Sequence, residues 1–183
     1  MNVKTATNVL LSAVLNEFWL HEGGQSAVGS LIDHVIQSHP SYPKIKTENI
    51  YKYLESKCQE EQQRLSLNSI HFLTQNLHML PDFHGNRSPL ADPDLRGSII
   101  GLSLDQSETS LALLYLCTIQ ALAYGTKLIV DHLMKHGHVI EQVAICGGLS
   151  KSDLFIQTIS DVLNLEVIKP NESESVLLGM ILQ

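Results

Sequence analysis

The chain has 183 residues, the size of one domain, and 44% of them are hydrophobic, which supplies a packed core and excludes a disordered chain. Its net charge is −7 with only 12 lysine and arginine residues, so no nucleic-acid partner is expected. The three cysteines form no CxxC pair and no apolar run reaches about 20 residues, so we expect a reducing, cytoplasmic location and no membrane partner.

The first half of the chain is predicted to be largely helical. Residues 1–17 are weakly patterned, but residues 25–38 carry apolar side chains at helical spacing and precede Pro40, which ends a helix. Residues 47–65 are predicted to form a second helix that is polar on most faces. Residues 70–79 resemble a buried strand.

A loop and the most strongly patterned helix follow. Residues 81–96 are rich in proline, glycine and charged side chains, which predicts a loop, and residues 97–102 are predicted to be a short strand. Asp105 and Glu108 resemble a capping box at the start of a long helix, and Gly137 is expected to end it. The apolar stripe of this helix consists of Leu111, Leu114, Thr118, Ala121, Leu122, Gly125, Leu128, Ile129 and Leu133.

The last third of the chain alternates between strands and helices. Residues 139–146 are predicted to form an apolar strand that ends in a Gly-Gly turn. A helix then begins near Asp153, a second strand is expected over residues 165–168, and a last helix is expected from about Ser173. This alternation indicates an α/β fold.

The turn Cys146-Gly147-Gly148-Leu149-Ser150 is the first candidate binding site. A Gly-Gly pair after a strand lets a ligand approach the backbone without meeting a Cβ atom, and a helix start offers free N–H groups and a positive dipole end. These features suit the base, ribose or phosphate of a nucleotide. The alternative is that the two glycines only make a tight turn.

Two other segments hold candidate polar residues. The loop 83–89 contains Arg87, whose fork of donors suits a phosphate or a carboxylate, although a surface salt bridge is the alternative. The turn 22–26 also opens a helix, but the G-x-S-x-G pattern of a serine hydrolase lacks its second glycine there.

The histidines do not predict a metal site. His132, His136 and His138 have partly ligand-like spacing, but no Glu or Cys completes a set and they straddle a helix end, so solvated histidines are expected instead. Neither the G-x-x-x-x-G-K-[ST] nor the G-x-G-x-x-G phosphate motif occurs in the chain.

Three motifs in order resemble the FGGY family of carbohydrate kinases, and in particular its ribulokinase-like members. The resemblance runs from about Phe18 to Gly179, so we divide the chain into a divergent N-terminal segment, 1–17, and a C-terminal nucleotide-binding domain, 18–183, truncated at both ends. The motifs are Phe18-Trp19-Leu20-His21-Glu22-Gly23-Gly24-Gln25-Ser26; Phe83-His84-Gly85-Asn86-Arg87-Ser88-Pro89-Leu90-Ala91-Asp92-Pro93 with Arg96-Gly97 and Gly101-Leu102; and Cys146-Gly147-Gly148-Leu149-Ser150-Lys151-Ser152-Asp153-Leu154-Phe155.

The resemblance implies one lobe of a two-lobed kinase with the actin-like ATPase (ribonuclease H-like) fold, a mixed sheet flanked by helices. It implies ATP or ADP with Mg²⁺ as the cofactor and a pentulose such as D-ribulose as the substrate of a phosphotransferase. Ser152 stands where the family usually carries an Asn that contacts adenine. The implied nucleotide contacts are Gly147, Gly148, Ser150, Ser152 and Gly97, and the substrate-side or loop candidates are Gly24, Gln25 and Arg87.

The family's phosphate loops and catalytic Asp are not found by motif, so the chain alone is expected to be catalytically incomplete. Three hypotheses remain: a carbohydrate-kinase domain with weak or vestigial nucleotide binding, a non-catalytic interaction or regulatory scaffold, and a kinase whose other lobe is a separate chain. They differ in whether ADP binds and in what the chain associates with, and the oligomeric state stays open.

Overall fold

The computed structural model describes residues 8–11, 17 and 19–171. Phe18, which begins the first motif, and the last helix expected from about Ser173 lie outside the described residues.

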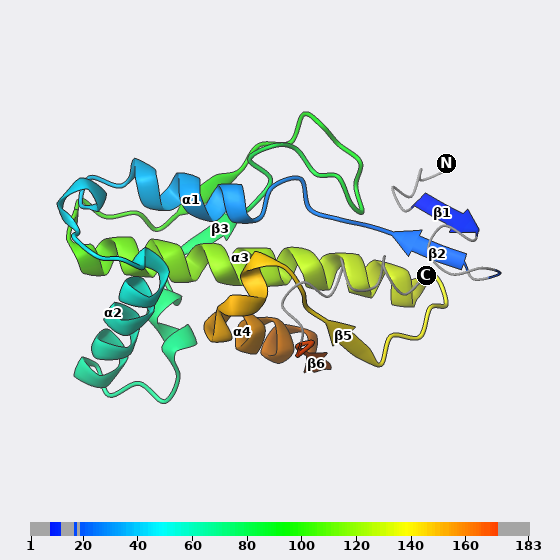
Figure 1. Ribbon diagram of the computed structural model, residues 1–183. Coiled ribbons are helices and arrows are strands. Elements are labelled where there is room, and N and C mark those ends of the chain that lie inside the picture. The colour runs from blue at the N-terminus through cyan, green and yellow to red at the C-terminus, as the bar shows by residue number, and fades with distance from the viewer. Residues whose placement is uncertain (1–7, 12–16, 18, 172–183) are drawn as a thin grey trace.

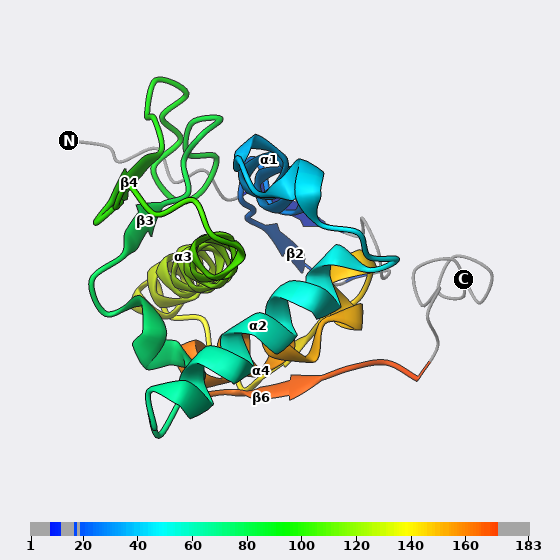
Figure 2. The ribbon, with the colours of Figure 1, turned by 90° about the vertical axis from the view of Figure 1, so that its left-hand side faces the viewer.

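Helix α3, Glu108–Lys135, is the axis of the fold. Ten of its residues are buried, and all ten lie between Leu111 and Ala123. Three shorter helices pack against it, as Figure 1 shows from the side and Figure 2 shows along its axis. These helices are α1, Gly29–Ser38; α2, Ile50–Arg64; and α4, Asp153–Leu163.

The core lies where the four helices meet. Leu31 and Ile36 of α1 and Leu54 of α2 are buried against the N-terminal half of α3, and Ile159 of α4 is buried on another side of it. The predicted stripe of α3 is confirmed at Leu111, Thr118, Ala121 and Leu122, which are all buried. It ends early, because Leu128 is half exposed.

By length and composition, α3 could cross a membrane, because it contains an 18-residue apolar window with few charges. However, 44% of that window is buried inside the protein, and three helices pack against α3. This is the pattern of a core helix, whose partners are helices of the same chain.

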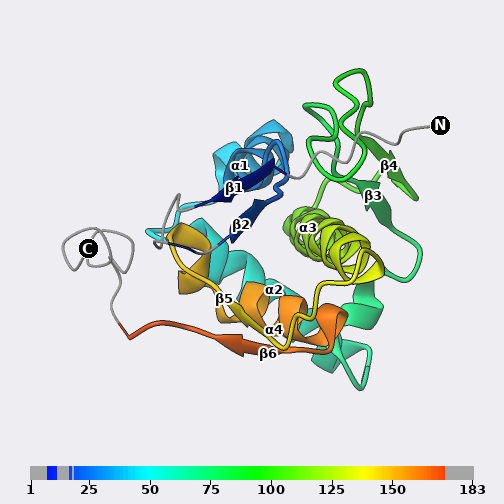
Figure 3. The ribbon, with the colours of Figure 1, turned by 90° about the vertical axis from the view of Figure 1, so that its right-hand side faces the viewer.

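The described strands form three separate pairs that lie around α3 (Figure 3), with both antiparallel and parallel pairing. The antiparallel pairs are β1, Asn8–Leu11, with β2, Trp19–Glu22, and β3, His78–Leu80, with β4, Ser98–Ile100; the parallel pair is β5, Gln142–Ala144, with β6, Glu166–Ile168.

The predicted strand over residues 70–79 is wrong for most of its length. Ile70–Thr74 forms a 3₁₀ helix, η2, and only His78–Leu80 forms a strand, β3. The Ser69 side chain accepts a hydrogen bond from the backbone N–H of His71 at 3.3 Å, which caps η2, and the Thr74 hydroxyl bonds the Gln120 side chain of α3. These polar contacts favour a helical turn over a ladder.

The predicted cap of α3 is also displaced. Ser107, and not Asp105, caps this helix, because the Ser107 hydroxyl accepts from the backbone N–H of Ser110 at 3.2 Å. Asp105 instead accepts from the backbone N–H of Ser107 at 2.9 Å and from its hydroxyl at 2.8 Å. The carboxylate therefore supports the cap from outside the helix.

Candidate functional site

The predicted Gly-Gly turn connects β5 to α4 and contains one 3₁₀ turn, η3, Gly148–Lys151. Gly147 has φ +80°, a conformation that side-chain-bearing residues rarely adopt. The Ser150 hydroxyl donates to the Gly147 carbonyl at 2.7 Å and closes the turn. Ser152 caps α4, because its hydroxyl accepts from the backbone N–H of Phe155 at 3.1 Å.

A cavity of about 590 Å³ lies beside this turn, between the start of α1, one face of α2 and the middle of α3. Gly148 and Ser152 line it, and a Cβ atom added at Gly148 would meet no atom within 4 Å. The volume falls in the usual range for small-molecule sites. Lys52 of α2 and Lys151 of η3 also line the cavity and bring positive charge to it.

Glu55 of α2 connects three elements at this cavity and was missed from the sequence. Its Oε1 atom accepts from the Ser152 hydroxyl at 2.8 Å and from the Tyr115 hydroxyl of α3 at 3.2 Å. Burial, and then the nearby Glu55 carboxylate, raise the pKa of Tyr115, so this hydroxyl stays protonated and donates. The only sequence signal for Glu55 was its place beside Leu54 in an otherwise polar helix.

Tyr51 lines the same cavity, and its hydroxyl is bound by Asp33, a residue that does not line the cavity. Its hydroxyl donates to the Asp33 carboxylate of α1, and this hydrogen bond, together with burial, raises the pKa of Tyr51 to about 12. The phenol is therefore neutral at physiological pH and ties α2 to α1 at the edge of the cavity.

Gly24, Gln25 and Arg87 come together at a second place that shares no lining residue with the first cavity. The backbone N–H of Gly24 donates to the Ser88 hydroxyl at 3.1 Å. The Gln25 side-chain amide donates to the Leu122 carbonyl at 2.9 Å and is 3.0 Å from the Thr126 hydroxyl, both on α3. Gln25 and Arg87 line a cavity of about 290 Å³.

Arg87 forms the surface ion pair that the sequence left as an alternative. Its guanidinium donates to the Glu22 carboxylate, and both side chains are half exposed. Ser26 adds a contact between the same two segments, because its hydroxyl donates to the Gly85 carbonyl at 3.0 Å. The turn 22–26 and the loop 83–89 are therefore clasped together; we call them the clasp.

No group of three or more His, Cys, Asp or Glu side chains is placed to hold a metal ion within the described residues. The ring centroids of His132 and His136 lie 4.4 Å apart, and those of His138 and His21 lie 4.2 Å apart. Mg²⁺ that accompanies a nucleotide is ordinarily held by its phosphates with one or two carboxylates.

Gly97 lies against Phe83 and is not among the residues that line the 590 Å³ cavity. A Cβ atom added at Gly97 would lie 1.8 Å from Cδ2 of the Phe83 ring, so only glycine fits under this ring. The observed role of Gly97 is therefore close packing of the loop 83–89.

Gly97→Ala is expected to lower the free energy of unfolding by about 1–3 kcal/mol, because the added methyl group must displace the Phe83 ring. Urea unfolding measures the change. Gly29→Ala is the matched control: its Cβ would meet nothing within 4 Å at the start of α1, so a gain of about 0.4–1 kcal/mol is expected. Equal effects of the two substitutions would contradict the packing role.

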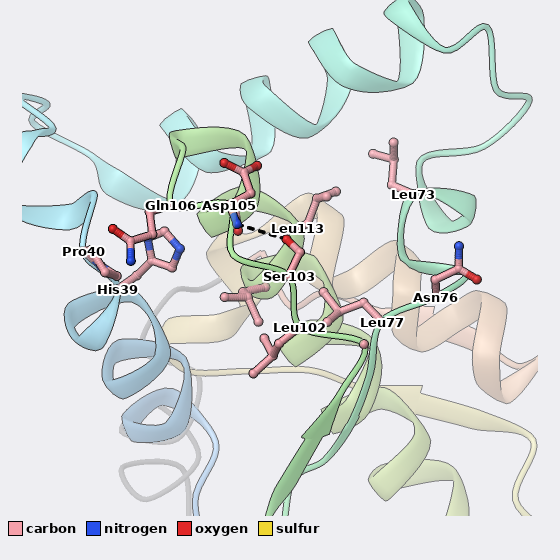
Figure 4. Close-up of a pocket in the computed structure, with 13 residues that line it drawn as sticks. His39, Pro40, Leu73, Asn76, Leu77, Leu102, Ser103, Asp105, Gln106 and Leu113 are labelled. Carbon is pink, nitrogen blue, oxygen red and sulfur yellow. Dashed lines mark hydrogen bonds between the residues drawn. The ribbon is translucent and has the colours of Figure 1, made fainter.

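A third cavity, of about 340 Å³, lies at the N-terminal end of α3 (Figure 4). His39, which follows α1, lines it together with Asp105 and is only 8% exposed. Its Nδ1 atom accepts from the backbone N–H of Ser41 at 3.2 Å, so the neutral ring carries its proton on Nε2. Burial lowers the pKa of His39, and the Asp105 carboxylate opposes this effect in part.

The free energy of unfolding is expected to fall as the pH drops below about 6.5, the ordinary pKa of histidine. Below that pH His39 is protonated in the unfolded chain but stays neutral in the folded chain, because folding lowers the pKa of His39. Urea unfolding between about pH 7.5 and about pH 5.5 measures the slope. His132, whose pKa burial also lowers, acts in the same direction, so the contribution of His39 is the difference between wild type and His39→Gln. Identical slopes for both proteins would contradict it.

A model of the FGGY family of carbohydrate kinases, C-terminal domain, matches residues 2–183. The match also covers the segment before Phe18, ahead of the motifs that carry the resemblance. An "FGGY carbohydrate kinase domain-containing protein" of Danio rerio is 46% identical over 173 residues, which are 92% of this chain and 32% of that protein. A D-ribulokinase of Saccharomyces cerevisiae is 34% identical over 163 residues, which are 84% of this chain and 22% of that protein.

Solved structures of sugar kinases share the fold. A ligand-bound xylulose kinase from Lactobacillus acidophilus superposes with a TM-score of 0.71 at 18% identity, over 97% of this chain and 32% of that one. A glycerol kinase from Plasmodium falciparum with ADP gives a TM-score of 0.66 at 19% identity, over 88% of this chain and 28% of that one. The chain therefore has the actin-like ATPase fold and spans about a third of the length of these proteins.

Proposed function

Because the chain belongs to the FGGY family of carbohydrate kinases, as their C-terminal domain, we propose that it binds ATP or ADP in the cavity beside Gly148. The observation that carries this proposal is the open turn itself. Gly147 follows strand β5 and has positive φ, Gly148 has free space where a side chain would be, and a capped helix follows. Such a turn lets a nucleotide lie directly on the backbone.

The charges around the cavity support the same assignment. Lys52 and Lys151 offer ammonium groups to phosphates, while Ile119 and Phe155 line the cavity with apolar surface that suits a flat base. Apolar walls with a few polar groups fix the orientation of a bound small molecule. A nucleotide has this division between an apolar base and charged phosphates.

We propose that the chain supplies the nucleotide side of ATP-dependent phosphorylation of a pentulose such as D-ribulose, in the cytoplasm. In that reaction a sugar hydroxyl oxygen bonds to the γ-phosphorus, the bond from that phosphorus to the β-phosphate oxygen breaks, and ADP leaves while the hydroxyl proton passes to a base. The name of the yeast relative, a D-ribulokinase, supports the choice of sugar. The role of this chain is to hold and orient ATP with its Mg²⁺.

Calorimetric titration of the 183-residue chain with ADP and Mg²⁺ tests the proposal. Saturable binding with one ADP per chain is expected, and ADP at about 100 times its Kd should raise the free energy of unfolding by about 2.7 kcal/mol. A folded chain that neither takes up ADP nor gains stability from it would overturn the proposal. That result would favour the alternative of an interaction or regulatory scaffold.

A further inference from the structure

We propose that Glu55 selects the base of the nucleotide, by accepting a hydrogen bond from the 6-amino group of adenine. This inference rests on the proposed nucleotide site and adds its specificity: the chain prefers adenine nucleotides over nucleotides of 6-oxo purines. It depends on the hydrogen bonds that surround Glu55 and on its place in the wall of the cavity.

The two oxygens of the Glu55 carboxylate are in different situations. Oε1 is engaged twice, by the hydroxyl groups of Ser152 and Tyr115. No hydrogen bond to Oε2 is found within residues 19–171, although Glu55 lines the cavity. The carboxylate is thus fixed through one oxygen, and the other is available to a ligand.

Ser152 and Tyr115 are positioning residues for this carboxylate. The Ser152 hydroxyl accepts from the backbone N–H of Phe155, so its own proton is directed to Glu55. Tyr115 is 2% exposed, and burial raises its pKa, so it too is a donor. Two donors, one on α3 and one at the cap of α4, hold Oε1 and so limit the rotation of the carboxylate.

A carboxylate accepts hydrogen bonds and offers none. Adenine presents an amino group at position 6, which donates, whereas hypoxanthine and guanine present a carbonyl oxygen there, which accepts. In the position that suits adenine, a 6-oxo purine would place this oxygen against Oε2, and its N1–H would reach Oε2 only after a shift of the base. Guanine could match a carboxylate through two adjacent donors, but it would need both oxygens, and Oε1 is already engaged.

Glu55→Gln is the substitution that tests this inference, because the geometry predicts which way the new amide turns. Ser152 and Tyr115 both donate, so the amide oxygen must take the place of Oε1. The amide nitrogen then takes the place of Oε2 and offers a donor to the cavity. The variant should therefore favour inosine diphosphate, whose 6-oxo group accepts.

The experiment is a calorimetric titration of the wild-type chain and of Glu55→Gln with ADP and with inosine diphosphate, both with Mg²⁺. The wild type is expected to bind ADP about tenfold more tightly than inosine diphosphate, and the variant is expected to lower that ratio by at least about tenfold. Glu48→Gln is the matched control, because it removes the same charge from an exposed residue just before α2 that does not line the cavity.

The outcomes separate this inference from the proposed function. If Glu55→Gln leaves the ratio of the two affinities unchanged, the role of Glu55 is overturned, whether both affinities fall together or neither falls. The proposed nucleotide binding stands in that case. Wild-type chain that binds neither nucleotide would overturn both. A ratio that changes equally in Glu48→Gln would show a general effect of charge and would also overturn the role of Glu55.

Discussion

Gly148→Asp is expected to weaken ADP binding by about fivefold to a thousandfold while the chain stays folded. A side chain at this position enters open space, because a Cβ atom there meets nothing within 4 Å, and Gly148 does not have the positive φ of Gly147. The new carboxylate would instead face the phosphates of the bound nucleotide. Repulsion between two charges at about 4 Å costs about 1 kcal/mol in water and about 4 kcal/mol near a protein surface, which is about a fivefold to a thousandfold loss of affinity.

Calorimetry with ADP measures this loss, and the melting temperature reports whether the fold survives. Gly148→Asn is the matched control, since it has nearly the same shape as the aspartate variant without its charge. It should lose less affinity than Gly148→Asp. If Gly148→Asp binds ADP as tightly as the wild type, the nucleotide does not lie on this turn.

Leu122→Ala is expected to destabilise the fold more than Gly97→Ala does. Leu122 is 0% exposed and lies in the middle of the buried part of α3, where the shorter helices meet. Removing its buried side chain loses apolar burial and leaves a cavity, which costs about 2–5 kcal/mol. In a domain of this size, that lowers the melting temperature by roughly 5–15 °C.

Thermal and urea unfolding test this expectation against Leu104→Ala, the same substitution at a residue that is 100% exposed. The control should change the free energy of unfolding by no more than about 0.5 kcal/mol. Similar effects at the two positions would mean that α3 is not the centre of the core.

The helices were predictable because their signals are local. Three helices were predicted from the spacing of polar and apolar residues, and the structure confirms all three with shifted ends: α1, α2 and α3. The strand expected over residues 70–79 was wrong in part because Thr74 bonds Gln120, a residue 46 positions away, in addition to the local cap at Ser69. A contact at that separation leaves no local pattern in the sequence.

The candidate site was predictable in part for the same reason. The Gly-Gly turn has a local signature, and it lies on the 590 Å³ cavity. Glu55 and Tyr115 reach that cavity only because α2 and α4 pack on α3, so the sequence around them did not predict that they meet there. Gly97 was predicted to contact the nucleotide, but in the structure the Phe83 ring explains why this residue is a glycine.

One helix carries both clusters of polar residues. Tyr115 of α3 holds Glu55 at the cavity, and further along the same helix the Leu122 carbonyl and the Thr126 hydroxyl hold Gln25 of the clasp. Residues 115 and 126 are about 16 Å apart along a helix that rises about 1.5 Å per residue. Gly125 is in such close contact with Gln25 that an added Cβ atom would lie 2.6 Å from its side-chain oxygen. Any displacement of α3 that moves Tyr115 would therefore also disturb the contacts of the clasp, so the two places share one rigid support.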